Sequence, residues 1–333
     1  MQQDSRLNFI RAVAVVMIVF CHFSQIIGLL DVAFWLNTGV QIFFVLSAYL
    51  MSQKQFSSRG DVWQFYKKRI LRIMIPMWIY TACLVLVLLV LRIHIAPIAI
   101  LLYALGLAGF APSGILGLGH FWYITVILIC YLLVPLMDSL SRNRNRWLWT
   151  VLISLLGLAL MTLVGKSAYG VNLALFLLTY MYFHTQSEPI TGKVPALWAI
   201  PTVLFSILRL YLDGYDFVNA QLYSLYDGIF VTTTKCLLGL WLFFMGMKVL
   251  KNGTNDRLTH YLSTRSYEIY LTHQFILLAV NEYVLPYIKS VPFSKIASLL
   301  LSIVMIVINV ELLRVLLVGT KRVFASCKHA NKE

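Results

Sequence analysis

The first apolar stretch of the chain, Leu7 to Ile27, contains an arginine and a histidine that could do chemistry, Arg11 and His22. A helix turns by about 100° per residue, so their spacing brings the two side chains to within about 20° of each other, roughly 16 Å apart along the axis. An imidazole at this depth in a membrane span is costly unless it faces protein or a wet cavity, so it marks a candidate site. Histidine also suits proton transfer near neutral pH. The spacing therefore predicts a catalytic face with His22 and Arg11 on it.

Structural explanations compete with this hypothesis. His22 would also be accommodated by a hydrogen bond to a neighbouring helix, and the long side chain of Arg11 can extend to the lipid headgroups. Sequence alone leaves both explanations open.

The composition places these residues in a membrane protein. Of the 333 residues, 60% are hydrophobic and 12% are charged, against about 45 to 50% apolar and 25% charged in soluble domains. The formal charge of +14 comes largely from lysines and arginines in short loops between apolar segments, where positive charge selects the cytoplasmic side. Nucleic acid is therefore not an expected partner, whereas membrane lipid is.

The expected fold class is all-α, a polytopic membrane helix bundle of about ten transmembrane helices in a single domain over residues 1–333. The expected spans are Leu7 to Ile27, Asn37 to Ser52, Ile75 to Leu91, His120 to Met137, Trp147 to Val164, Val171 to Phe183, Pro195 to Tyr211, Ile229 to Met247, Tyr267 to Val284 and Ile296 to Leu317.

One further apolar piece, Ile95 to Phe110, is short and is followed by Ala111, Pro112 and Gly114. It is expected to be a re-entrant or interfacial segment. Leaving it out of the count puts the Arg142 to Arg146 loop and both termini in the cytoplasm, as the charge bias requires.

The cysteines favour neither a disulfide framework nor a metal site. They are five in number, widely spaced, and mostly inside apolar stretches. No metal ligand set and no permanently bound cofactor are expected.

Five segments, in order, carry a family resemblance. Arg11 and His22 form an Arg-x10-His pair in the first helix. The others are GVQIFFVLSAYLMS from Gly39, FYKKRILRIMIP from Phe65 with its Arg69-x-x-Arg72, HFWYITVILICYLLVP from His120, and SYEIYLTH ending at His273. With these features the chain resembles acyltransferase family 3, the integral membrane O-acyltransferases of bacterial surface glycans. It departs from that pattern at Gln41, where the family often has Asp, and at Ala48, where it often has Gly.

The resemblance implies transfer of an acetyl group from cytoplasmic acetyl-CoA to a glycan hydroxyl. Such a reaction needs a base near the hydroxyl, and His22 is the candidate. A nucleophilic role through a transient acyl-imidazole cannot be separated from it by sequence.

The resemblance also implies a donor site at the start of the third helix. Arg69 and Arg72 stand at i and i+3, so both can point toward the phosphates of the donor, with Lys68 beside them. The alternative is that topology alone requires basic residues there. His120, Trp122, Tyr270 and His273 are expected to line the cavity or the acceptor site.

These observations favour a multi-pass enzyme of the bacterial cytoplasmic (inner) membrane. Its expected reaction is O-acetylation of a surface glycan such as lipopolysaccharide O-antigen or exopolysaccharide, with a lipid-linked glycan as the expected acceptor. The main alternative is a transporter or flippase, although neither inverted repeats nor helices broken near midplane are evident. A structural membrane subunit is a third possibility, but it would give His22 no role beyond packing.

Overall fold

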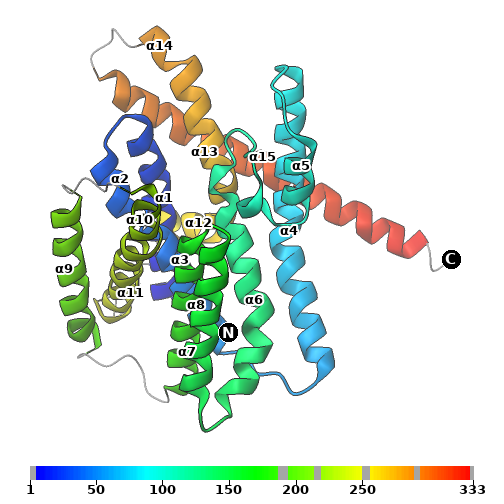
Figure 1. Cartoon of the computed structure of the whole chain (residues 1–333). Helices are drawn as coiled ribbons and strands as arrows, with labels where there is room; N and C mark the ends of the chain where they lie inside the picture. The colour runs from blue at the N-terminus through cyan, green and yellow to red at the C-terminus, as the bar shows by residue number, and fades with distance from the viewer. Residues whose placement is uncertain (1–4, 187–193, 214–218, 250–255, 289–292, 331–333) are drawn as a thin grey trace. The chain divides into compact units, whose positions relative to one another are not determined.

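The computed structural model describes residues 5–186, 194–213, 219–249, 256–288 and 293–330. Within these residues every regular element is a helix (Figure 1). The expected all-α class is confirmed.

The elements follow one another without long irregular connections in the described ranges. In chain order they are α1 (Ser5–Ile26), α2 (Leu30–Leu36), α3 (Gly39–Ser52), α4 (Arg59–Val90), α5 (Pro97–Ala104), η1 (Ala108–Phe110), η2 (Gly119–Phe121), α6 (Trp122–Ser141), α7 (Arg146–Leu163), α8 (Ser167–Thr185), α9 (Val194–Leu212), α10 (Ala220–Leu225), the π-helix η3 (Tyr226–Val231), α11 (Thr232–Val249), α12 (Arg257–Thr264), α13 (Ser266–Tyr283), α14 (Leu285–Ile288) and α15 (Ser294–Ala330).

Each expected span matches one of these helices or a joined pair, with an overrun of one residue at the end of α1, α4, α7 and α13. By length and composition, 7 of the described helices could cross a membrane: α1, α2 with α3, α4, η2 with α6, α7, α10 with α11, and α15. The other expected crossings correspond to α8, α9 and α13, which do not meet that criterion. Polar residues inside two of them, such as Asn172 and His273, lower their hydropathy. The polytopic bundle is confirmed, and crossing by these three helices stays a prediction.

The segment Ile95 to Phe110 forms the 8-residue helix α5. A helix of this length rises about 12 Å, too little to cross a hydrocarbon core of about 30 Å. Pro97 stands at its first turn, where a missing N–H costs nothing. The segment is thus too short to span, as expected, and its re-entrant or interfacial position stays a prediction.

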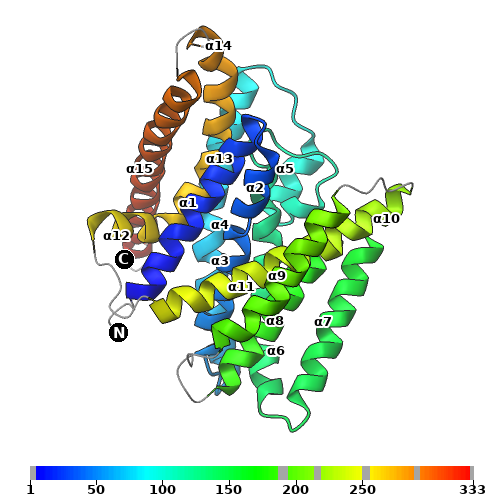
Figure 2. The ribbon, with the colours of Figure 1, turned by 90° about the vertical axis from the view of Figure 1, so that its left-hand side faces the viewer.

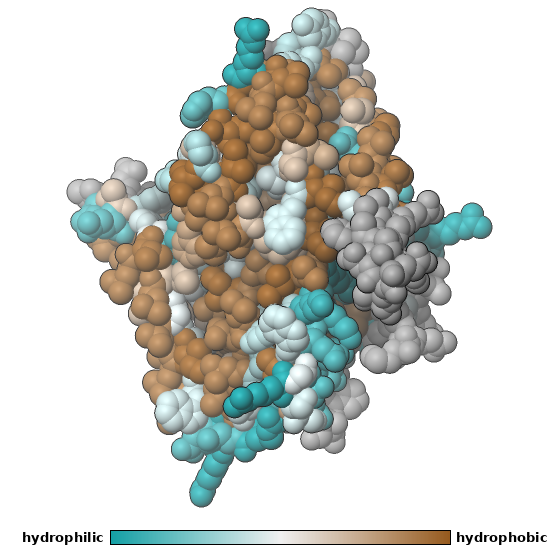
Figure 3. Space-filling model, turned by 90° about the vertical axis from the view of Figure 1, so that its right-hand side faces the viewer, coloured by the Kyte–Doolittle hydropathy of each residue, from teal (hydrophilic) through white to brown (hydrophobic). Residues whose placement is uncertain are grey.

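Helix α7 has its polar residues inside and its apolar residues outside. Thr150 is buried and donates its hydroxyl to the Arg146 carbonyl, at 2.8 Å. Leu148, Leu155 and Leu163 are exposed. Elsewhere on the molecule, the face drawn in Figure 3 is also predominantly hydrophobic. Apolar surface of this extent is expected in contact with lipid rather than with water.

The described chain divides into two compact units. Unit 1 comprises residues 1–21, 31–66 and 126–264, and unit 2 comprises residues 22–30, 67–125 and 265–333. The single domain over 1–333 stays a prediction.

Within unit 1, α3 packs against α8 and α11, and α7 packs along α8 (Figures 1 and 2). The buried Gln41 amide donates to Asn172 Oδ1 at 3.2 Å, which pairs α3 with α8. A Cβ on Gly239 of α11 would lie 2.7 Å from the Gln41 Cβ, so only glycine permits this approach. Ala48 is fully buried. The two departures from the family pattern therefore both contribute to helix packing: Gln41 forms an amide pair with Asn172, and Ala48 packs its methyl group inside the bundle.

Within unit 2, α13 packs against α15 and is tied to α4. Arg265 and Arg314 both approach the Glu311 carboxylate of α15, at 3.8 and 2.9 Å. The Tyr267 hydroxyl of α13 donates to the Ile73 carbonyl of α4 at 2.8 Å, and the Tyr80 hydroxyl of α4 donates to the Thr272 carbonyl at 3.4 Å. These contacts fix α13, which carries His273.

The close approach of α3 and α11 predicts a specific sensitivity at Gly239. Gly239→Ala should destabilise the protein by about 1 to 3 kcal/mol, because the added methyl group overpacks a buried contact. Thermal unfolding of the purified protein in detergent would measure it. Gly319→Ala is the matched control, since nothing lies within 4 Å of that position in α15. Equal melting temperatures for the two variants would contradict the close packing.

Candidate functional site

Three histidines from distant parts of the sequence meet in unit 2. His22 lies near the end of α1, His120 in η2 and His273 in α13. Their ring centroids are 6.0 Å apart for His22 and His120, 5.1 Å for His22 and His273, and 4.7 Å for His120 and His273. The structure thus brings the expected base together with two of the expected cavity residues. We call this group the histidine cluster.

Both ring nitrogens of His120 are engaged. Nε2 lies 2.7 Å from the Tyr270 carbonyl oxygen, which can only accept, so Nε2 carries a hydrogen. Nδ1 lies 2.5 Å from Gln274 Oε1, which also accepts the His120 backbone N–H at 3.1 Å. The Tyr270 hydroxyl in turn donates to the His120 carbonyl. Both ring nitrogens therefore face oxygen atoms of α13, so His120 fastens η2 to α13 and has no ring nitrogen open to a substrate.

His273 is held by one nitrogen only. Its Nδ1 donates to the Tyr270 carbonyl at 2.8 Å and lies 3.2 Å from the Ile269 carbonyl. The neutral ring then has its lone pair on Nε2, which is buried and has no hydrogen-bond partner among the described residues. Leaving a buried polar atom unpaired costs about 1 to 3 kcal/mol. The Nε2 atom of His273 is therefore an acceptor in need of a donor.

His22 has the same arrangement but is more open. Its Nδ1 lies 2.8 Å from the Gln25 side-chain oxygen, one turn further along α1. With that oxygen accepting, the hydrogen is on Nδ1 and the lone pair is on Nε2. His22 is partly exposed, whereas His120 and His273 are buried. Of the three histidines, His22 is the least enclosed.

The loop before η2 places His120 against α13. The Tyr103 hydroxyl of α5 donates to the Leu118 carbonyl at 3.1 Å and accepts the Ile115 N–H at 3.4 Å. Burial raises the pKa of the Tyr103 phenol, so it stays a donor. Gly117 has φ +76°, and a Cβ there would lie 2.7 Å from the Phe275 side chain. A glycine is needed for the loop to pass this close to α13.

Tyr270, one of the expected cavity residues, packs against the histidine cluster, and Trp122 follows His120 by two residues in the chain; their role in a cavity or acceptor site stays a prediction. The Tyr270 ring lies 4.8 Å from that of His120 and 5.4 Å from that of Tyr123. Trp122 is partly exposed at the start of α6. Its neighbour Tyr123 makes a ring contact with Tyr270.

The expected donor residues lie on α4, in unit 2. Arg69 and Arg72 are one turn apart in a continuous helix, Arg69 partly buried and Arg72 exposed, and Lys68 is exposed next to them. Arg11 is partly exposed and belongs to unit 1, on the same uninterrupted helix α1 as His22.

Sequence reasoning missed the two glutamines of the site. Gln25 follows His22 by three residues, a spacing that puts both on one helix face and that the sequence could have revealed. Gln274 directly follows His273, and only the folded chain brings it to His120. Among the residues that the structure describes, no group of His, Cys, Asp or Glu side chains is arranged to hold a metal ion.

The geometry predicts that His120 and Gln274 act as one stabilising unit. Gln274→Ala should lower the free energy of unfolding by about 1 to 3 kcal/mol, because it leaves the His120 Nδ1 and N–H unpaired. His120→Ala should cost a similar amount, and the double variant less than the sum. Thermal unfolding of all three proteins in detergent would measure this. Strict additivity would contradict the coupling.

A comparison with protein families gives one match. A family model described as an acyltransferase domain matches residues 4–310, nearly the whole chain. A search of the curated proteins found no match, and neither did a search of the solved structures.

Proposed function

Since the chain belongs to acyltransferase family 3, and is therefore a membrane acyltransferase, we propose that it acylates the hydroxyl of a surface glycan. The proposed donor is cytoplasmic acetyl-CoA or a related short acyl-CoA. The proposed acceptor is a lipid-linked glycan of the O-antigen or exopolysaccharide type. The family assignment disfavours the transporter and structural-subunit alternatives.

The observation that carries this proposal is the state of His22. Its Nδ1 is held by Gln25, so its Nε2 lone pair is available on a partly exposed ring. A general base needs such a lone pair within reach of the hydroxyl. His120, with both nitrogens engaged, does not meet this requirement.

The reaction then balances with protein groups alone. His22 Nε2 takes the hydroxyl proton as the glycan oxygen bonds to the thioester carbonyl carbon. The C–S bond breaks, and the departing thiolate takes the proton back from the imidazolium. The products are the glycan ester and free CoA.

His273 fits a supporting role in this step. Its Nε2 lone pair is buried and unpaired among the described residues, and its ring centroid is 5.1 Å from that of His22. When His22 is protonated, an N–H donor becomes available close to this lone pair. His273 would thus stabilise the imidazolium, as a positioning residue.

The same lone pair on His22 would also serve a nucleophile. In that variant Nε2 attacks the thioester first and an acyl-imidazole passes the acyl group to the glycan. Rapid quenching with labelled acetyl-CoA alone would separate the two, since only this variant leaves label on the protein.

For the donor we propose Arg69 and Arg72, with Lys68. Their i, i+3 spacing places both guanidinium groups on the same face of α4, and each can bind two phosphate oxygens in a bidentate manner. The proposed orientation places this end of α4 and both termini in the cytoplasm, in a bacterial inner membrane.

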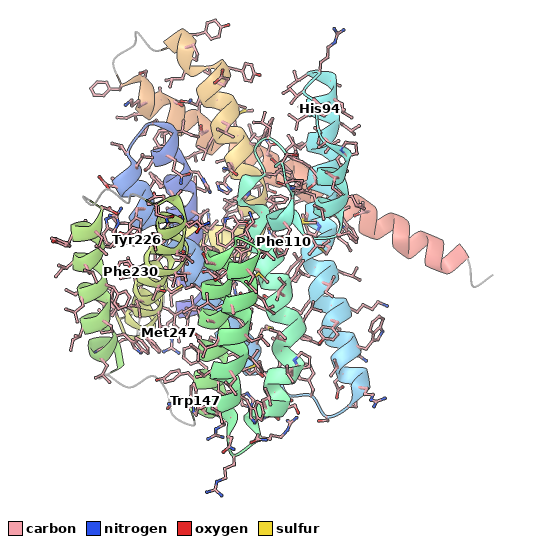
Figure 4. The ribbon with its side chains drawn as sticks, in the orientation of Figure 1. His94, Phe110, Trp147, Tyr226, Phe230 and Met247 are labelled. Carbon is pink, nitrogen blue, oxygen red and sulfur yellow. The ribbon has the colours of Figure 1, made fainter. Side chains whose placement is uncertain are left out.

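Substitution of His22 tests the catalytic assignment. Both His22→Ala and His22→Gln should lower acylation per inserted molecule by about 10² to 10⁴, because neither side chain can take the proton. Mass spectrometry of the surface glycan, normalised to membrane-inserted protein, measures this. His94→Gln is the control, an exposed histidine in unit 2 (Figure 4).

Two outcomes would decide against this assignment. If the His22→Gln protein keeps near-normal activity, His22 serves packing and is not the base. Loss of activity in His273→Gln but not in His22→Gln would move the base to His273.

Substitution on α4 tests the donor site. Replacing both Arg69 and Arg72 by Ala should raise the KM for acetyl-CoA by about tenfold or more, since each charge-assisted bond is worth about 1.5 to 3 kcal/mol. Replacement of both by Lys should restore part of the loss, because charge remains without the fork.

Lys67→Ala supplies the matched control for this test. Lys67 is exposed on α4, about 160° around the helix from Arg69. It therefore removes a positive charge from the same region without altering the proposed face. An equal effect of Lys67→Ala on the KM would mean that the basic residues serve topology only.

A further inference from the structure

Unit 1 contains two cations that face an aromatic ring. Arg209 of α9 has its Cζ 3.8 Å from the centre of the Phe34 ring of α2, and Lys235 of α11 has its Nζ 4.7 Å from the same centre. Trp35 lies edge-on to Phe34, and its ring centre is 5.8 Å from the Arg209 Cζ. We call Phe34, Trp35, Arg209 and Lys235 the cation cluster.

Arg209 has more donors than partners. Its side chain is 9% exposed, and one nitrogen, Nη2, pairs with the Asp213 carboxylate one turn later. The Nε and Nη1 atoms are buried and have no hydrogen-bond partner in the described part of the chain. Burying an arginine in this state is costly, and an acceptor at the cluster would remove the cost.

Lys235 also has no close counter-ion among the described residues. It is partly buried at the start of α11, and no hydrogen bond or ion pair joins it to another residue of the described ranges. Asp227 of η3, eight residues earlier in the chain, forms no ion pair with it. Among the described residues, the carboxylates beside the cluster in the chain are thus Asp213, which pairs with Arg209, and Asp227, which pairs with neither cation.

An unusual backbone segment borders the cluster. Residues Tyr226–Val231 form the π-helix η3, and such segments occur often at functional sites. The Tyr226 hydroxyl donates to Asp213 Oδ1 at 3.4 Å, and its ring stacks on that of Phe230 (Figure 4). Tyr226 thereby holds the carboxylate that pairs with Arg209.

We propose that the cation cluster binds the phosphate group of an anionic membrane lipid. A phosphate offers several oxygens and can accept both from a guanidinium fork and from an ammonium group. The lipid part of the ligand follows from the location, because α2 with α3 and α10 with α11 are both long and apolar enough to span a membrane. The phosphate would displace Asp213 from Arg209 and engage Lys235.

The phosphate can come from a phospholipid headgroup or from a polyprenyl phosphate that carries the glycan. The second source rests on the proposed function, whereas phosphate binding itself does not. If the carrier is the ligand, the cluster belongs to the acceptor site of the enzyme.

Lipid binding to the purified protein tests the proposal. The probes are a polyprenyl phosphate, the same polyprenol without phosphate, and phosphatidylglycerol, titrated in detergent and followed by native mass spectrometry. The wild-type protein should bind a phosphate-bearing lipid at least about tenfold more tightly than the polyprenol. Preference for the polyprenyl phosphate identifies the carrier, and preference for phosphatidylglycerol identifies a headgroup site.

The variants separate binding from folding. The double variant Arg209→Gln with Lys235→Met should lose the preference for phosphate. Lys166→Met should keep it, since Lys166 is a cation near another ring of unit 1, Tyr169, at 5.6 Å. Asp213→Asn removes no cation and should tighten binding several-fold, because the competing carboxylate is gone.

Equal affinity for the polyprenol and both phosphate-bearing lipids would overturn the proposal. So would unchanged phosphate preference in the double variant together with unchanged affinity in Asp213→Asn. Neither result depends on acyltransferase activity, so failure here is distinguishable from failure of the proposed function.

Discussion

A polar atom buried among apolar helices has no water to bond with, and this constraint governs the polar residues of both units. In unit 2 it is met by hydrogen bonds between η2 and α13, which join His120 to Tyr270 and Gln274. In unit 1 the Gln41 amide N–H meets it by donating to Asn172 Oδ1. Several buried atoms of the described residues have no partner, and two of these groups, His273 Nε2 and the Arg209 guanidinium, lie beside other charged or titratable side chains and so point to chemistry or binding.

The histidine cluster illustrates how partners rather than residue type assign roles. His120 has both nitrogens occupied and is a fastening residue. His22 donates its Nδ1 hydrogen to an amide oxygen and His273 donates its Nδ1 hydrogen to a backbone carbonyl, so each ring has its lone pair on Nε2. Two such rings about 5 Å apart can share a proton, which suits a reaction where a proton leaves one oxygen and returns to a sulfur.

The cation cluster is subject to the same constraint, but there the unpaired groups are hydrogen-bond donors rather than an acceptor. There the structure supplies more donors than acceptors, and aromatic rings take the place of carboxylates beside the charges. An aromatic face attracts a cation but leaves its N–H groups free to bond elsewhere. A site built in this way can bind an anion without the cost of displacing a full set of ion pairs.

The sequence by itself determined the membrane class, the helical segments and the family, because hydropathy and helical spacing are local properties. It also indicated His22 as the candidate base, which stays a prediction, and the short segment that contains α5. Tertiary structure alone decided that both ring nitrogens of His120 have partners, since these partners are about 150 residues away in the chain. It also decided that Arg209 and Lys235 share one ring of α2. Such pairings depend on which helices pack together, and apolar helices of similar composition do not encode that choice in any local pattern.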